Sequence, residues 1–332
     1  MQFVNRCVGC VWCGIFAMGF VLTIGSPSAF AASVTWDATT GNGTDEEGAG
    51  TWTTGGTNWF PGDHAWAAGD SATFGAGGSG SYAVDLSGGI SAATATIASG
   101  ATYTIGGTGT LTLTTNTASC LTANSNTTAT FECPVVLPNQ SAAGIIGLMV
   151  NGGATLTMST LTGPAGAGVK TRLEVNGGTL VVTQSVSMLA AYGTLTVENG
   201  GTVSATGSGA ITSANAYSAS YANPTWWGYD FRSGTVSAPL SGTGKMLKST
   251  SDTVTLTGAN NYSGPTYLYQ GVLIAGASSL SPNSMIYLRA ATNTTPAYLL
   301  SNGTMSRKLG TTITWEVSQY GLGGLGAYCG AP

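Results

Sequence analysis

The chain has 332 residues, of which only 7% are charged and 51 are glycine, and its formal net charge is −4. The few Lys and Arg residues are scattered, which argues against nucleic acid as a partner. Helix-forming Glu, Lys and Arg are scarce, whereas hydrophobic residues make up 42% and alternate with Thr and Ser. The composition therefore argues against a helical protein and against a disordered chain, and it indicates an all-β fold.

Residues 1–31 have the features of a secretory signal peptide. Arg6 precedes an apolar run from Val8 to Ile24, and Ala29-Phe30-Ala31 forms a cleavage site of the small-x-small type. The apolar run is shorter than the roughly 20 residues that a membrane-spanning helix needs. We therefore predict a secreted or cell-surface protein that meets a membrane only through this peptide, during export.

Residues 32–89 differ from the rest of the chain because they are rich in tryptophan. Trp36, Trp52, Trp59 and Trp66 are separated by Gly- and Thr-rich turns. The end of a stacked repeat exposes unpaired strand edges and an open apolar core, so an aromatic-rich N-terminal capping segment is the first interpretation. Sugar-stacking platforms are the alternative. The burial of the rings would distinguish the two.

Residues 90–332 are predicted to form repeats, and three Asn-Gly-Gly segments show the period. Leu156, Leu180 and Val203 occupy equivalent positions at a nearly constant spacing of about 24 residues, which is typical of a stacked repeat. Asn-Gly-Gly favours a tight turn, and the alternation after it predicts a strand with one buried face. Stacking at about 4.8 Å aligns the three residues in one interior column. We therefore predict a single-stranded parallel β-helix, or β-solenoid, truncated at its C-terminus within a further repeat.

Two cysteines in the repeats, Cys120 and Cys133, are candidates for a disulfide in an exported protein. Buried thiols are the alternative, because sequence does not determine the pairing.

An aromatic insertion interrupts the repeats near Trp226, Trp227 and Tyr229. Loops that leave a solenoid coil often carry its binding function. We therefore name these three residues as candidates for glycan binding.

One copy of a longer motif lies between residues 241 and 276. It contains Thr253-Val254-Thr255-Leu256-Thr257-Gly258-Ala259-Asn260-Asn261-Tyr262-Ser263-Gly264-Pro265-Thr266, followed by Gly271-Val272-Leu273. This segment resembles the autotransporter-associated β-strand repeat of secreted bacterial passenger proteins. The resemblance implies a β-helix at the bacterial surface or outside the cell, and it transfers no catalytic residue. The repeat-motif positions are Gly258, Asn260, Tyr262, Gly264, Thr266, Gly271 and Leu273.

The residues that could support catalysis are few. His64 is the only histidine, and the acidic residues lack the spacing of a calcium loop. Cys7, Cys10 and Cys13 have a spacing that suggests a metal site, but they lie in or beside the apolar run with no further ligands nearby, so we expect no metal and no cofactor. Glu174 and Glu198 could lie one coil apart beside Lys170 and Arg172, although sequence leaves open whether the two acids share a face. We therefore predict a non-enzymatic passenger that acts as a stalk, adhesin or matrix component, with surface glycans or matrix components as candidate partners. A carbohydrate-binding module and a polysaccharide lyase or hydrolase are the alternatives.

Overall fold

The computed structural model describes residues 31–75, 79–98, 100–116, 119–139, 146–215, 227–276, 278–289, 295–304, 313–314 and 323–327. The predicted signal peptide, apart from Ala31, and the candidate Trp226 lie outside these residues. Within the described ranges, no helix has the length and apolar character needed to cross a membrane.

One long sheet, called sheet A below, takes its strands from successive turns of the chain. All neighbouring pairs are parallel except β1 and β3, which pair antiparallel at the N-terminal end. In spatial order its strands are β28 (Ile313–Thr314), β26 (Ile286–Leu288), β24 (Thr266–Leu268), β22 (Met246–Lys248), β19 (Tyr229–Phe231), β16 (Ala190–Glu198), β14 (Gly166–Asn176), β12 (Leu148–Val150), β10 (Leu121–Ala123), β7 (Ala95–Ile97), β4 (Ser71–Phe74), β1 (Ser33–Trp36) and β3 (Trp59–Phe60).

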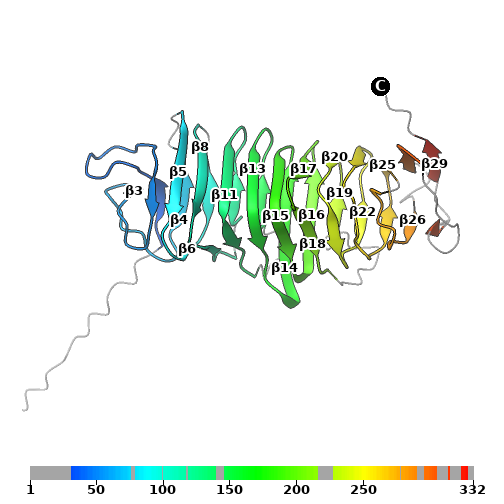
Figure 1. The fold of residues 1–332 in the computed structure, drawn as a ribbon, viewed down its shortest axis with the longest axis horizontal. Helices are drawn as coiled ribbons and strands as arrows, with labels where there is room; N and C mark the ends of the chain where they lie inside the picture. The colour runs from blue at the N-terminus through cyan, green and yellow to red at the C-terminus, as the bar shows by residue number, and fades with distance from the viewer. Residues whose placement is uncertain are drawn as a thin grey trace, which may run out of the picture. The chain divides into compact units, whose positions relative to one another are not determined.

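Sheet B receives the intervening strands. Its main path runs through β2 (Gly50–Trp52), β5 (Ser81–Leu86), β8 (Thr102–Gly107), β11 (Thr128–Val136), β13 (Thr155–Thr162), β15 (Thr179–Met188), β17 (Thr202–Ala205), β20 (Gly234–Val236), β23 (Thr253–Leu256), β25 (Gly271–Ala275), β27 (Ala297–Ser301) and β29 (Gly323–Ala327). Beside this path lie β6 (Ile90–Ala92), β9 (Leu111–Leu113), β18 (Ala210–Ser213) and β21 (Leu240–Gly242). Because the chain alternates between the two sheets and its strands stack in chain order, the fold is the predicted parallel β-solenoid (Figure 1).

The predicted interior column is confirmed. Leu156 pairs in register with Leu180, and Leu180 pairs with Val203. All three side chains are fully buried, while Thr155, Thr179 and Thr202 beside them form a parallel row on the outer face. The alternation of Leu or Val with Thr therefore sets the two faces of the strand, because successive side chains of a strand point to opposite sides.

The coils of this column are unequal in length. The step from Val203 to its partner Val236 is longer than the step from Leu180 to Val203, and the next step, from Val236 to Leu256, is shorter. The longer coil contains the aromatic insertion. One long and one short coil thus account for a separation between Val203 and Leu256 that is close to twice the basic period.

The four cap tryptophans pack together inside the N-terminal end of the fold. Trp36, Trp52, Trp59 and Trp66 are all buried, and the Trp52 and Trp66 rings meet edge to face with centroids 4.8 Å apart. Phe74 of β4 joins the cluster 5.5 Å from Trp52. The tryptophans therefore cover the first coils of the core, and none of them exposes a face on which a sugar could stack.

Candidate functional site

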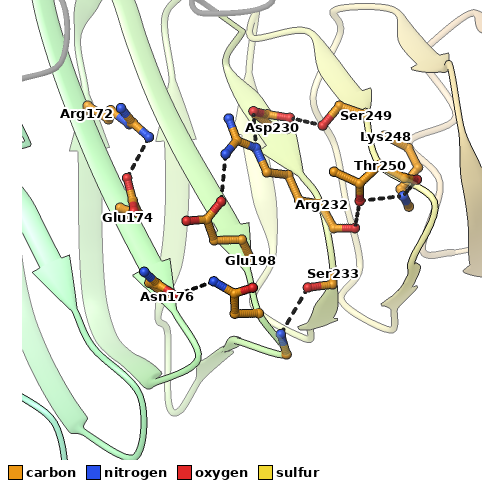
Figure 2. A network of polar contacts seen from close by, with 12 residues as sticks. Arg172, Glu174, Asn176, Glu198, Asp230, Arg232, Ser233, Lys248, Ser249 and Thr250 are labelled. Atoms are coloured by element: carbon orange, nitrogen blue, oxygen red, sulfur yellow. Dashed lines mark hydrogen bonds and ion pairs between the residues drawn. The ribbon is translucent and has the colours of Figure 1, made fainter. Parts of the chain in front are cut away.

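The main cluster of charged side chains lies on the outer face of sheet A, across β14, β16 and β19 (Figure 2). Glu174 aligns with Thr196, and Thr196 aligns with Asp230. The neighbours Val175, Val197 and Phe231 point into the core and are buried. The strand alternation therefore directs this row of polar side chains away from the core, and the register between coils brings the carboxylates together.

Arg172 and Glu174 form an ion pair on β14. Arg172 Nη2 lies 2.6 Å from Glu174 Oε2, and Glu174 is only 5% exposed. Burial raises the pKa of Glu174; the positive charge of Arg172 acts in the opposite direction, and the adjacent Glu198 raises it further. The structure therefore places the predicted pair Glu174 and Glu198 on one face, on neighbouring coils.

Arg232 connects two acidic residues of neighbouring coils. Its Nη1 lies 2.6 Å from Glu198 Oε2, and its Nε donates to Asp230 Oδ2 across 3.0 Å. Ser249 donates to the other oxygen of Asp230 across 2.7 Å. Burial raises the pKa of Asp230, although Arg232 and Ser249 both favour its charged form. The carboxylates are thus held by fixed partners from three coils.

Lys248 lies at the end of β22 in register with the buried Phe231 and Leu268, is itself fully buried, and is linked to the network through Thr250. Its Nζ donates to the backbone oxygens of Thr250 and, across 3.1 Å, of Gln270. Thr250 donates its hydroxyl to the backbone oxygen of Arg232. Burial lowers the pKa of Lys248 to about 8. Sequence reasoning overlooked this lysine, which the repeat pattern places at an ordinary strand end.

This geometry is poorly suited to glycoside hydrolysis. A retaining enzyme holds its two carboxyl groups about 5 Å apart, and an inverting enzyme holds them further apart, so that a sugar or a water can enter between them. Glu174 and Glu198 instead lie close enough that the charge of Glu198 raises the pKa of Glu174. Each also pairs with an arginine. The network is therefore better suited to linking coils than to transferring protons to a substrate.

The aromatic insertion does not offer the predicted glycan platform in its described part. Trp227 is 2% exposed, and its ring meets Tyr267 edge to face at 5.0 Å. Tyr229 lies inside the coil, where its hydroxyl donates to Ser241 O across 2.6 Å and accepts from Ser213 N across 3.1 Å. This corrects the prediction for Trp227 and Tyr229, because a ring enclosed on both faces cannot stack on a sugar.

Cys120 and Cys133 are buried thiols that are not joined to each other. Cys120 directly precedes β10 of sheet A, whereas Cys133 lies on β11 of sheet B. Burial raises the pKa of Cys133 to about 11, so its thiol stays protonated and unreactive. The structure thus corrects the disulfide hypothesis in favour of its alternative.

The polar residues of the repeat motif link coils. Asn260 is buried, accepts from Leu240 N across 2.8 Å and donates to Ser279 O. The Tyr262 hydroxyl lies 2.7 Å from Thr266 Oγ1, inside the core. One asparagine therefore bonds the coil before it and the coil after it, which is a structural reason for the Asn-x-Tyr spacing.

The glycines of the motif lie where no side chain fits. A Cβ on Gly258 would come within 2.5 Å of Ala238 O, and one on Gly264 within 2.4 Å of Gly244 O. Gly271 has a φ of 76°, in the left-handed region that favours glycine. Leu273 is buried in the core. All seven motif positions thus have structural roles.

One aspartate of the N-terminal capping segment is buried and bonded to backbone groups and to the histidine. Asp70 is buried and accepts from Ala32 N across 2.7 Å and from Ala67 N across 2.8 Å. His64 Nε2 lies 2.8 Å from its second oxygen. Burial acts to raise the pKa of Asp70, but these bonds favour the charged carboxylate and leave the pKa below its ordinary value. Among the described residues, no group of three or more His, Cys, Asp or Glu side chains could hold a metal ion.

A second polar feature, which sequence reasoning missed, is a hollow of about 310 Å³ on the outer face of sheet B. Phe131 contributes to its lining, together with the polar residues Thr130, Glu132, Thr157, Ser159, Thr183 and Gln184. The signal that could have revealed it is Met158-Ser159-Thr160-Leu161, where two successive polar residues break the alternation.

In comparisons with known proteins, the chain matched no protein-family model, no curated protein and no solved structure.

Proposed function

We propose that the protein is a non-enzymatic, exported β-solenoid that acts at the cell surface as a stalk, adhesin or matrix component. The observation that carries this proposal is that the carboxylates most suited to catalysis already form ion pairs within the protein. Glu174, Glu198 and Asp230 are each ion-paired with an arginine of the same network. General acid–base chemistry needs a titratable group within reach of a substrate proton, and these carboxylates are occupied by protein partners.

The repeat architecture supports the same proposal. In a solenoid each coil contacts mainly its neighbours, so added coils extend the molecule without disturbing those already formed. The motif residue Asn260 bonds the coils on both sides of it, which is what a mechanical or spacing element requires. The resemblance of residues 241–276 to autotransporter-associated repeats points in the same direction.

Export is supported by the sequence of residues 1–31, with its cationic start, apolar run and small-x-small site. The low charge and the abundance of Thr and Ser also suit a surface that faces polymers outside the cell. We therefore place the protein outside the cytoplasm, secreted or held at the surface of a bacterium.

The test has two independent arms. The full chain, expressed with a C-terminal epitope in a Gram-negative host, should become sensitive to protease added to intact cells, and a variant lacking residues 1–31 should stay protected. The secreted chain, incubated with a panel of polysaccharides, should release neither reducing ends nor unsaturated products. Release that disappears in both Glu174→Gln and Glu198→Gln would instead establish an enzyme at the sheet A network.

A further inference from the structure

Three successive coils of sheet B are irregular at the same place. The pairing of β11 with β13 shifts between Phe131 and Pro134, and the pairing of β13 with β15 shifts between Met158 and Thr160. A β-bulge bends its strand and redirects side chains, and such bulges are over-represented beside functional sites. Here the bulges are aligned from coil to coil. They therefore open a continuous hollow where the rest of the face is regular.

The hollow is lined by groups that can bond a ligand. Glu132 and Gln184 are exposed, and Thr130, Thr157 and Ser159 are half-buried. Within the described part of the chain, none of these five side chains forms a hydrogen bond or ion pair with the protein. The neighbouring Thr183 makes one long bond, of 3.4 Å, to Met158 O. The hollow thus presents a carboxylate, an amide and three hydroxyls whose hydrogen-bonding capacity is available.

The surroundings of the hollow are rich in hydroxyls. Thr102, Thr128, Thr155, Thr179 and Thr202 form a single row across five strands, in register. Neighbouring strands of such a row are about 4.8 Å apart. Over β8, β11, β13, β15 and β17, Glu132 is the one charged residue. A ligand over these five strands meets regularly spaced hydroxyls and the carboxylate of Glu132, and the exposed Asp85 of the adjacent β5 adds a second negative charge nearby.

We propose that the hollow over β11, β13 and β15 binds a neutral polysaccharide whose chain lies along the stacking direction. A carboxylate and an amide accept and donate bonds to sugar hydroxyls, and threonine hydroxyls do both. A uronic-acid or phosphate polymer would face Glu132 with no cation on these strands to offset the repulsion. This inference rests on the proposed surface location, where such polymers occur.

The lining also distinguishes this site from an apolar ligand pocket. Small-molecule pockets are lined predominantly by hydrophobic and aromatic side chains. Here Phe131, Met158 and Val182 point into the core and are buried, and the outward residues between them are polar. The hollow therefore favours a hydrated, hydroxyl-rich ligand. This site replaces the Trp227 and Tyr229 region as the place where glycan contact is expected.

The experiment uses the secreted chain and neutral hexasaccharides of glucose, mannose and xylose, with a galacturonic-acid hexasaccharide as the charged comparison. Thr157→Val is a conservative probe because Val181, its register partner on β15, already carries valine in that row. Thr253→Val, on the outer face of β23 and away from the hollow, is the matched control, because its register partner Val272 is also a valine. Calorimetry should detect binding of at least one neutral probe. Thr157→Val should weaken it by about 3- to 10-fold, as expected for one lost hydrogen bond, and Glu132→Ala by about 10-fold or more.

The control should bind like the parent, and all variants should melt like it. A measurement that needs no variant is the shift of threonine methyl signals, which should concentrate on Thr130 and Thr157. The proposal fails if no neutral probe binds at millimolar concentration, if the galacturonic-acid probe binds equally well, or if Thr253→Val loses as much affinity as Thr157→Val. None of these failures affects the surface location or the absence of cleavage, which are measured separately.

Discussion

Asn199 donates a hydrogen bond from Nδ2 to Oδ1 of Asn176 across 2.6 Å, and so joins the Asn-Gly turns of two successive coils. Asn199 also has a φ of 53°, in the left-handed region. Asparagine tolerates this conformation better than other residues with side chains. One residue type therefore satisfies both the turn and the link between coils.

The two roles of Asn199 can be separated by two substitutions. Asn199→Gly keeps the backbone conformation and removes the amide, so the free energy of unfolding should fall by about 0.5–1.5 kcal/mol. Asn199→Ala adds the strain of a left-handed alanine and should cost about 1 kcal/mol more. The midpoints of urea unfolding provide the comparison. Equal midpoints for the two variants would show that the turn conformation carries no penalty.

Leu180 is the central member of the interior column and has partners on both sides. Leu180→Ala should lower the free energy of unfolding by about 2–5 kcal/mol, because it leaves a cavity in a packed core. Leu180→Asp should prevent folding and secretion, since it buries an unpaired charge. Val181→Thr, on the outer face of the same strand, should change stability by less than about 0.5 kcal/mol. A Leu180→Asp chain that is secreted and melts like the parent would contradict the register.

Glu174 should make stability depend on pH in the acid range. Its pKa is raised in the folded state, so the folded chain binds a proton more tightly than the unfolded chain. The stabilising contribution is complete below the unfolded pKa of about 4.5 and is lost as the pH rises through the folded value. Glu174→Gln, which resembles the protonated acid, should therefore match the parent in acid and exceed it at pH 7. Thermal melting from pH 3 to pH 8 tests this, with Glu46→Gln on the exposed loop as the control. Equal melting temperatures for parent and Glu174→Gln at pH 7 would refute it.

Lys248 should have the opposite effect, at alkaline pH. Its pKa falls from 10.5 to about 8 on folding, so between these values the unfolded chain holds a proton that the folded chain has released. Stability should rise with pH in this window, by at most about 1.4 kcal/mol per pH unit for one proton. In Lys248→Met this rise should be absent. Urea unfolding of both chains at pH 7.5 and pH 10 measures the difference. Parallel slopes in the two chains would mean that Lys248 does not titrate in the window.

Several features of the fold can be predicted from local pattern. Leu156, Leu180 and Val203 are recognisable as an interior column because strand alternation and a nearly constant repeat period are properties of short segments. The cap tryptophans follow the same reasoning. They cluster because the end of a solenoid core must be covered from solvent. Such features depend on the sequence within one coil, so they can be recognised without knowing how the coils pack.

Tertiary structure decided what the outer faces do. A long coil and a short coil lie side by side, so residues that meet across them are separated by no constant interval. For this reason the sequence showed no sign of the bond between Arg232 and Glu198, which joins two coils. It left open whether Glu174 and Glu198 share a face because these acids precede Asn176 and Asn199 at different offsets. The burial of Trp227 against Tyr267 has the same origin. Alternation fixes which side of a strand a residue takes, whereas its partners in the next coil depend on how many residues the connecting turns contain.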